Sequence, residues 1–224
     1  VEAIRLKATL VGNGTGCPRD PGRAGSLLER IEAIDPYAAV QLAAAREMRT
    51  AADEAARAVE TLSLSPDIRV ARGLLTGQEC RYVRVLAEPQ LEPSFVVDPA
   101  SSGRTPPPVR TSTGMSFAPF AEDRVIQLVN ERLAQVTGTA AEQGEPLHVL
   151  RYLPGQEYRP HVDALPGVAN QRHWTVLVYL NEGYGGGATR FDLAGVEFSG
   201  RGGGALKARR SRQAPATRAH PPAS

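Results

Sequence analysis

The stretch from His148 to Leu206 carries the strongest structural pattern, and it reads HVLRYLPGQEYRPHVDALPGVANQRHWTVLVYLNEGYGGGATRFDLAGVEFSGRGGGAL. The runs HVLRY, EYRPHVD, WTVLVYL, ATRFD and VEF are separated in it by Pro-Gly, Asn-Glu-Gly and Gly-Gly-Gly. Each run predicts one short strand, because glycine and proline favour the turns that separate strands. Several short strands in series predict a β-sandwich or jelly roll.

One of these runs contains His161-Val162-Asp163. In a strand, residues i and i+2 point to the same side, so the imidazole of His161 and the carboxylate of Asp163 would converge. Such a pair offers two ligands to a metal ion, but it also occurs as an ordinary hydrogen-bonded pair on a sheet. The tripeptide by itself leaves both interpretations open.

The chain before this stretch begins with helical sequence. Residues 1 to about 64 are rich in Ala, Glu, Arg and Leu, and Asp35-Pro36 predicts the start of a helix that runs to about Thr61. Ser65-Pro66 then ends the helical pattern. We therefore place a helical segment over residues 1–65.

Two pairs of residues have the spacing of a capping box, which marks the first turn of a helix: Ser26 with Glu29, and Thr76 with Glu79. A further helix is predicted from about Glu122 to Val136, since apolar residues recur there at helical spacing up to a glycine. Short strands are predicted around residues 68–70, 95–97 and 115–117.

The stretch GNGTGCPRDPGRAGSLLERIEAIDPYAAVQLA, residues 12–43, resembles the Sel type of tetratricopeptide-like repeat, in which a Gly-rich turn and a D-x-x-x-A helix recur. A single repeat cannot bury its faces alone. The resemblance therefore implies a helical repeat segment that docks against a protein partner.

Composition excludes several classes of protein. The 26 basic and 24 acidic residues balance, so no global field attracts nucleic acid. There are only two cysteines, Cys17 and Cys80, far apart in sequence and with no CxxC pairing, so neither a disulfide scaffold nor a zinc ribbon is supported. No run approaches the roughly 18 apolar residues of a membrane helix. We expect a cytoplasmic protein without a membrane partner.

Over about residues 68–206 the chain resembles the catalytic jelly roll of the prolyl 4-hydroxylase group of Fe(II)/2-oxoglutarate dioxygenases. The motifs that carry the resemblance are RYLPGQEYRPHVD, TVLVYLN and GGATRF, in that order, with LLTGQEC and VRTSTGM upstream. It implies an α+β fold: a double-stranded β-helix, or jelly roll, with supporting helices, preceded by the α-helical repeat segment.

The resemblance also implies an oxidoreductase that hydroxylates a peptidyl proline or a similar C–H substrate and releases succinate and CO2. Its cofactors would be Fe(II), 2-oxoglutarate as co-substrate, and ascorbate. Matching positions take the family's roles: His161 and Asp163 as metal ligands, Tyr152 and Thr175 in the 2-oxoglutarate pocket, and Tyr158, Arg110, Ser112 and Glu145 at the substrate groove under a lid formed by residues 99–110.

The C-terminus departs from the family pattern. Two further strands should bring a distal His within S-x-H-x-G and a base that pairs with 2-oxoglutarate, but this sequence has KARRSRQAPATRAHPPAS instead. We therefore predict a domain over residues 66–206 that is incomplete at its C-terminal end, and a basic disordered tail over residues 207–224. His220 is the candidate for the third metal ligand, whereas His148 and His173 are expected to serve packing or capping.

Two other functions compete with the dioxygenase. A degenerate or truncated oxygenase could act as a non-catalytic protein-binding module, since two ligands without a third hold iron weakly. The basic tail could contact nucleic acid, but it lacks the aromatic residues that usually accompany such binding. A histidine that reaches the site opposite His161 would favour the enzyme.

Overall fold

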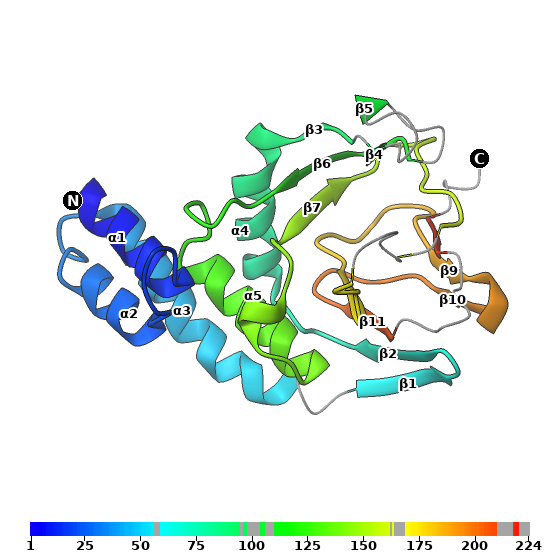
Figure 1. Ribbon diagram of the computed structural model, residues 1–224, viewed down its shortest axis with the longest axis horizontal. Helices are drawn as coiled ribbons and strands as arrows, with labels where there is room; N and C mark the ends of the chain where they lie inside the picture. The colour runs from blue at the N-terminus through cyan, green and yellow to red at the C-terminus, as the bar shows by residue number, and fades with distance from the viewer. Residues whose placement is uncertain are drawn as a thin grey trace. The chain divides into compact units, whose positions relative to one another are not determined.

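The computed structural model describes residues 1–55, 59–94, 96–97, 104–105, 110–161, 163, 169–209 and 217–219 (Figure 1). The chain divides into two compact units, each built from two segments. The first unit consists of residues 1–57 and 116–148, and the second of residues 58–115 and 149–224. The predicted domain boundaries after residues 65 and 206 remain predictions.

The first unit is helical. Among its described residues it contains α1 (Glu2–Asn13), α2 (Pro21–Glu29), α3 (Pro36–Ala55), α5 (Arg124–Thr137) and the short 3-10 helix η2 (Ala141–Gln143). The first three helices bury one apolar cluster, made of Ala8, Val11, Ala24, Leu27, Leu28, Ile31, Ala38 and Leu42.

Local capping residues explain where these helices begin. Asp35 starts α3 as predicted, because its carboxylate accepts hydrogen bonds from the backbone N–H groups of Tyr37 and Ala38 at 2.9 and 3.4 Å. The expected capping box at Ser26 is wrong, since α2 already begins at Pro21 with Asp20 as its cap. An aspartate followed by proline is the stronger start, because proline's backbone angle already suits the first helical turn.

The predicted extension of α3 to Thr61 is also wrong, since residues 59–64 form strand β1 (Val59–Leu64). This strand pairs antiparallel with β2 (Asp67–Ala71). The last four residues of β1, TLSL, alternate polar and apolar residues with the period of a strand. Because the sequence upstream is Ala-rich, the helix was predicted to continue across this change of period.

The second unit contains two antiparallel sheets. The larger has the strand order β1-β2-β11-β8, with β8 at Trp174–Val178 and β11 at Ala205–Arg209; the smaller has the order β10-β9-β12, with β9 at Thr189–Phe191, β10 at Val196–Phe198 and β12 at Thr217–Ala219 (Figure 1). Residues of both sheets share one core, namely Ile68, Val70, Phe191 and Leu206, with partly buried neighbours that include Leu177, Tyr179, Val196 and Phe198. This is the predicted α+β jelly roll.

The other helices and strands lie before or between the strands of these two sheets along the chain. They are α4 (Gly77–Ala87), the 3-10 helices η1 (Glu88–Gln90) and η3 (Asp192–Ala194), a sheet of β3 (Glu92–Pro93), β6 (Thr113–Ser116) and β7 (His148–Arg151), and the pair β4 (Val96–Val97) and β5 (Arg104–Thr105). Most of the proposed lid at 99–110 lies outside the described residues.

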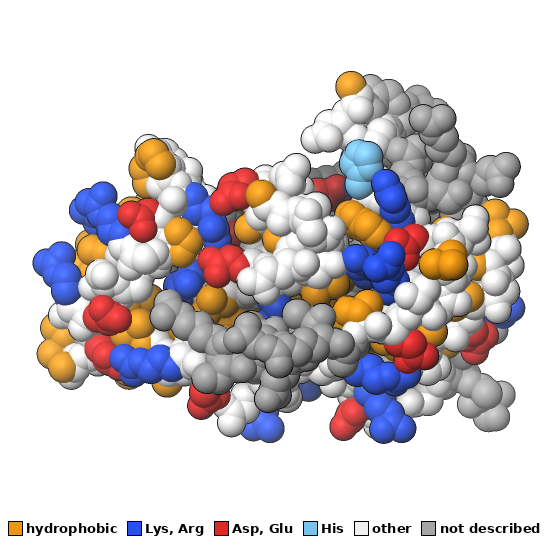
Figure 2. Space-filling view, turned by 90° about the horizontal axis from the view of Figure 1, so that it is seen from below, with side chains coloured by type: hydrophobic (Ala, Val, Ile, Leu, Met, Phe, Trp, Pro, Cys, Tyr) orange, Lys and Arg blue, Asp and Glu red, His pale blue; other side chains and the backbone are white. Residues whose placement is uncertain are grey.

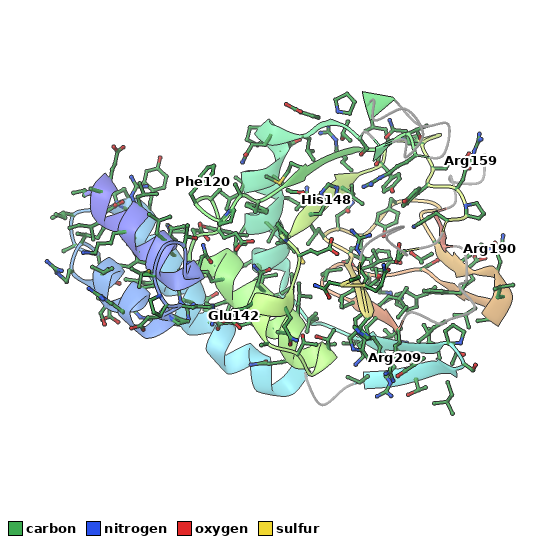
Figure 3. All side chains as sticks on the ribbon, viewed as in Figure 1. Phe120, Glu142, His148, Arg159, Arg190 and Arg209 are labelled. Atoms are coloured by element: carbon green, nitrogen blue, oxygen red, sulfur yellow. The ribbon has the colours of Figure 1, made fainter. Side chains whose placement is uncertain are left out.

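Strand β11 corrects the predicted start of the disordered tail at residue 207. Lys207 and Arg209 belong to this strand, which pairs with β2 on one side and with β8 on the other. Backbone pairing on both sides holds the strand whatever its side chains are, and the Lys207 ammonium lies 4.3 Å from the centre of the Trp174 ring. Arg209 marks the end of this strand in Figure 3.

Strand β12 is the second correction to the tail. Thr217, Arg218 and Ala219 pair antiparallel with β9, opposite Phe191, Arg190 and Thr189. We expected no strand there because the segment lacks β-branched aliphatic residues. Hydrogen bonding to an existing strand outweighs that weak local preference.

On the face shown in Figure 2, Lys and Arg side chains are interspersed with Asp and Glu side chains. Among the described residues, no helix combines the length and the apolar character needed to span a membrane.

Candidate active site

His161 and Asp163 lie together, as their spacing predicts, but on an irregular segment and not on a strand. The His161 Nε2 atom is 3.3 Å from Asp163 Oδ1, and the two side chains are 16% and 29% exposed. In the described part of EYRPHVD, only Tyr158 makes a β-bridge, with Arg110. Pro160 explains the difference, since proline has no N–H to donate to a sheet.

The other ring nitrogen of His161 is held by the backbone. His161 Nδ1 lies 2.9 Å from the carbonyl oxygen of Arg159, a residue labelled in Figure 3. A carbonyl only accepts, so Nδ1 carries a proton and donates it to Arg159. The opposite ring nitrogen, Nε2, faces the Asp163 carboxylate.

His161 Nε2 and Asp163 Oδ1, 3.3 Å apart, can share a cation between them. A proton on Nε2 satisfies the pair, and so does a metal ion bound by both atoms. A backbone carbonyl on the second ring nitrogen is the usual outer support of a histidine that binds metal. The donors therefore fit two of the three protein positions of an iron site of the 2-His-1-carboxylate type.

Thr175 on β8 holds the second oxygen of Asp163. The Thr175 hydroxyl donates a hydrogen bond of 2.6 Å to Asp163 Oδ2. Hydrogen bonds from His161 and Thr175 lower the pKa of Asp163, the first having the larger effect, whereas burial opposes them. Asp163 is thus kept ionised and oriented, as a metal ligand must be.

Tyr158 stacks on His161. The two ring centroids are 3.6 Å apart with an interplanar angle of 17°. The Arg110 guanidinium carbon lies 5.0 Å from the centre of the same tyrosine ring. Burial is the main cause that raises the pKa of Tyr158, and the Arg110 charge partly offsets it. Tyr158 is therefore a neutral phenol between a cation and the imidazole.

The other predicted residues differ in how closely they join this group. Ser112 is buried and receives a 3.1 Å hydrogen bond from Arg110 Nε. Tyr152 is half-buried and acts electrostatically on Tyr158, so it lies nearby. Glu145 is exposed and belongs to the first compact unit, and His220 lies outside the described residues.

Sequence reasoning did not single out Arg172. Its charge contributes to the lowered pKa of Asp163 and partly offsets the raised pKa of Tyr158. A cation therefore lies near these two side chains. The only sequence signal for Arg172 is that a basic residue shortly precedes the WTVLVYL strand. That pattern is too common to identify a functional residue. His148, by contrast, contacts Ser116 Oγ through Nδ1 at 2.6 Å, consistent with a packing or capping role (Figure 3).

Within the part of the chain that the structure describes, no three His, Cys, Asp or Glu side chains form a metal-binding group. His161 and Asp163 are therefore a pair to which a third ligand must be added from elsewhere.

Comparison with known proteins finds similarity to oxygenases of one superfamily. Residues 147–220 match the family model of the 2OG-Fe(II) oxygenase superfamily. Prolyl 4-hydroxylase 1 of Arabidopsis thaliana is 39% identical over 142 residues, which cover 61% of this chain and 50% of that protein. Probable prolyl 4-hydroxylase 10 of the same plant is 38% identical, with coverage of 64% and 51%. The chain thus spans about half the length of these relatives.

Solved structures share the fold. A viral collagen prolyl hydroxylase from Paramecium Bursaria Chlorella virus-1 superposes with a TM-score of 0.54 at 22% identity, covering 70% of this chain and 89% of that one. A Pseudomonas putida prolyl-4-hydroxylase superposes with a TM-score of 0.51 at 18% identity, covering 79% and 93%.

Proposed function

From the match of residues 147–220 to the oxygenase superfamily, we propose that this chain is an Fe(II)- and 2-oxoglutarate-dependent dioxygenase. It hydroxylates a peptidyl proline or a similar C–H substrate and releases succinate and CO2. The observation that carries the proposal is the pair His161 Nε2 and Asp163 Oδ1, which face each other at 3.3 Å inside the matched segment.

In this proposal His161 and Asp163 hold the iron. When bound, ferrous iron supplies the activation of dioxygen that the side chains of a protein cannot perform alone. The chain's own groups orient the ligands: the Arg159 carbonyl keeps the proton on His161 Nδ1, and the Thr175 hydroxyl holds Asp163 Oδ2.

His220 is the proposed third ligand. It follows Ala219 at the end of β12, which pairs with β9 of the jelly roll, and the family match ends at residue 220. A histidine that directly follows a strand of the smaller sheet supports the proposal that this sheet supplies the third metal ligand. The proposal needs no other histidine.

The remaining assignments are proposals from the family resemblance. Tyr152 and Thr175 bind 2-oxoglutarate, ascorbate maintains the iron, and Tyr158, Arg110, Ser112 and Glu145 contact a peptide substrate. The closeness of Arg110, Ser112 and Tyr158 supports their acting at one site. The Thr175 hydroxyl has one proton, which it donates to Asp163 Oδ2, so it would have to release that hydrogen bond to donate to a carboxylate of 2-oxoglutarate.

The alternative is a degenerate oxygenase that binds a protein partner without catalysis. Among the described residues, no group of three His, Cys, Asp or Glu side chains could hold a metal ion. For the helical segment we propose a Sel-type repeat that docks a partner in the cytoplasm, supported by three helices around one apolar cluster.

The test is an anaerobic titration of the whole chain with Fe(II) and 2-oxoglutarate, followed by the charge-transfer absorption of the complex. We expect the band in the wild type and its loss in His161→Ala and in His220→Ala. His148→Ala is the matched control and should keep the band. A folded wild-type chain without the band excludes the enzyme and favours the binding module.

A further inference from the structure

We infer that Tyr158 is a positioning residue for His161, and that Arg110 holds Tyr158 in place. This inference rests on the proposed function for its consequence, since it concerns how a metal ligand is oriented. It goes beyond a contact between Tyr158 and substrate, because the stack exists in the protein alone.

His161 lies outside the described strands of the sheets. Its ring contacts two groups at its edge: Nδ1 donates to the Arg159 carbonyl at 2.9 Å, and Nε2 lies 3.3 Å from Asp163 Oδ1. Contacts at the edge permit a tilt of the ring about the line that joins them, and a contact on the ring face restrains that tilt.

Tyr158 supplies that contact. A ring separation of 3.6 Å at 17° is a parallel stack, which restricts the imidazole to one plane. The hydrogen bond at Nδ1 and the stack on the ring face together define the direction of Nε2, which points at Asp163. An aromatic ring achieves this without donating or accepting a proton at the imidazole.

Arg110 and its neighbours then hold Tyr158. Arg110 pairs with Tyr158 in a β-bridge and lies over its ring at 5.0 Å. Beside this bridge, Thr111 and Glu157 form three hydrogen bonds: Thr111 N–H and Oγ1–H donate to the Glu157 carbonyl at 3.1 and 3.2 Å, and Glu157 N–H donates to Thr111 Oγ1 at 2.9 Å.

Ser112 extends this support. Arg110 Nε donates to Ser112 Oγ at 3.1 Å, and Ser112 Oγ is 2.9 Å from Ser94 Oγ. Ser112 is only 2% exposed, so the arginine is held against a buried point. A chain of fixed contacts therefore runs from Ser112 through Arg110 and Tyr158 to His161.

The experiment compares Tyr158→Leu with Tyr158→Phe, which keeps the ring but removes the hydroxyl. Tyr184→Leu, at an exposed tyrosine of the same unit, is the matched control. The probe is Mn(II) alone, without peptide or 2-oxoglutarate, so a residue that only contacts substrate leaves the metal affinity unchanged. Circular dichroism checks that each variant folds.

We expect Tyr158→Leu to weaken Mn(II) binding by about tenfold, the lower end of what loss of an outer support costs a metal site. Tyr158→Phe and Tyr184→Leu should stay within about twofold of the wild type, and Arg110→Gln should lie between. An unchanged affinity in Tyr158→Leu overturns the inference.

A second measurement separates this inference from the proposed function. In the metal-free chain, stacking on Tyr158 shifts the His161 ring-proton resonance upfield; the shift should persist in Tyr158→Phe and vanish in Tyr158→Leu. If the wild type binds no metal, the proposed function fails while this result still decides the stack. An unshifted His161 resonance in the wild type overturns the inference by itself.

Discussion

At the scale of single residues, the site consists of polar groups that orient one another. Asp163 receives one hydrogen bond from Thr175 and faces the imidazole of His161, so both of its oxygens are engaged. The convergence of His161 and Asp163 was predictable, since two residues separated by one position are never far apart. The partners Tyr158 and Arg110 were predicted only as substrate contacts.

Lys207 carries the first prediction, because it is only 8% exposed and lies over Trp174, the single tryptophan of the chain. Lys207→Gln should lower the free energy of unfolding by about 1 kcal/mol through loss of the cation–π contact. Lys207→Arg keeps a cation and should lose less. Urea unfolding followed by Trp174 fluorescence measures both, and equal losses would argue against the contact.

At the scale of elements, the residues at which helices begin and end follow from the neighbouring sequence. Helix α4 begins with the predicted capping box: Glu79 N–H donates to Thr76 Oγ1 at 3.2 Å, and Thr76 N–H donates to Glu79 Oε2 at 2.7 Å. Helix α5 ends, as predicted, at Gly138, whose φ is 70°. Both signals lie within a few residues, which is why the sequence alone reveals them.

Removal of the cap of α4 tests that rule. Thr76→Ala should destabilise the protein by about 1 kcal/mol, because the first turn of the helix loses a partner for its N–H group. Thr76→Ser retains the hydroxyl and should stay close to the wild type. The free energy of unfolding in urea distinguishes them, and indistinguishable variants would show that the cap contributes little.

Gly203 precedes β11 and tests the turn that leads into the larger sheet. Its φ is 80°, and a Cβ there would overlap the Leu75 carbonyl oxygen. Gly203→Ala should cost about 1–2 kcal/mol for the left-handed backbone and about 1–3 kcal/mol more for the overlap.

Gly195→Ala is the control for that substitution, since φ is 61° and no atom lies within 4 Å of the added Cβ. It should show the backbone cost alone. Thermal unfolding of the two variants gives the difference, and a smaller loss at Gly203 than at Gly195 would contradict the close approach.

At the scale of the whole molecule, the core of the jelly roll makes stability depend on pH. Burial raises the pKa of Tyr179 to about 12, while its hydrogen bond with Thr189 partly opposes that shift. The unfolded chain releases the phenol proton near pH 10, and the folded chain releases it only near pH 12. Stability is therefore complete below pH 10 and falls as the pH rises toward 12.

The expected loss from Tyr179 between these values is up to about 3 kcal/mol. Tyr179→Phe lowers stability at neutral pH by about 1 kcal/mol through the lost hydrogen bond, but it removes this part of the pH dependence. Unfolding free energies of both proteins between pH 8 and pH 12 measure the difference. Parallel curves would exclude Tyr179 as the group responsible.

The sequence alone predicted the strands at HVLRY, WTVLVYL, ATRFD and VEF, the caps of α3 and α4, the end of α5 and the closeness of His161 to Asp163. The strand predicted over EYRPHVD was wrong, since its described residues make only the bridge at Tyr158. The correct predictions depend on steric and hydrogen-bonding preferences that act within a few residues.

The pairing of distant segments is visible only in the tertiary structure. It continues β11 through Lys207 and Arg209, adds β12 to β9, and joins residues 116–148 to the N-terminal helices. It also brings Arg110 to Tyr158, which lies far along the chain. Pairing between distant backbone segments requires no local signature, since every residue except proline offers the same N–H and C=O groups.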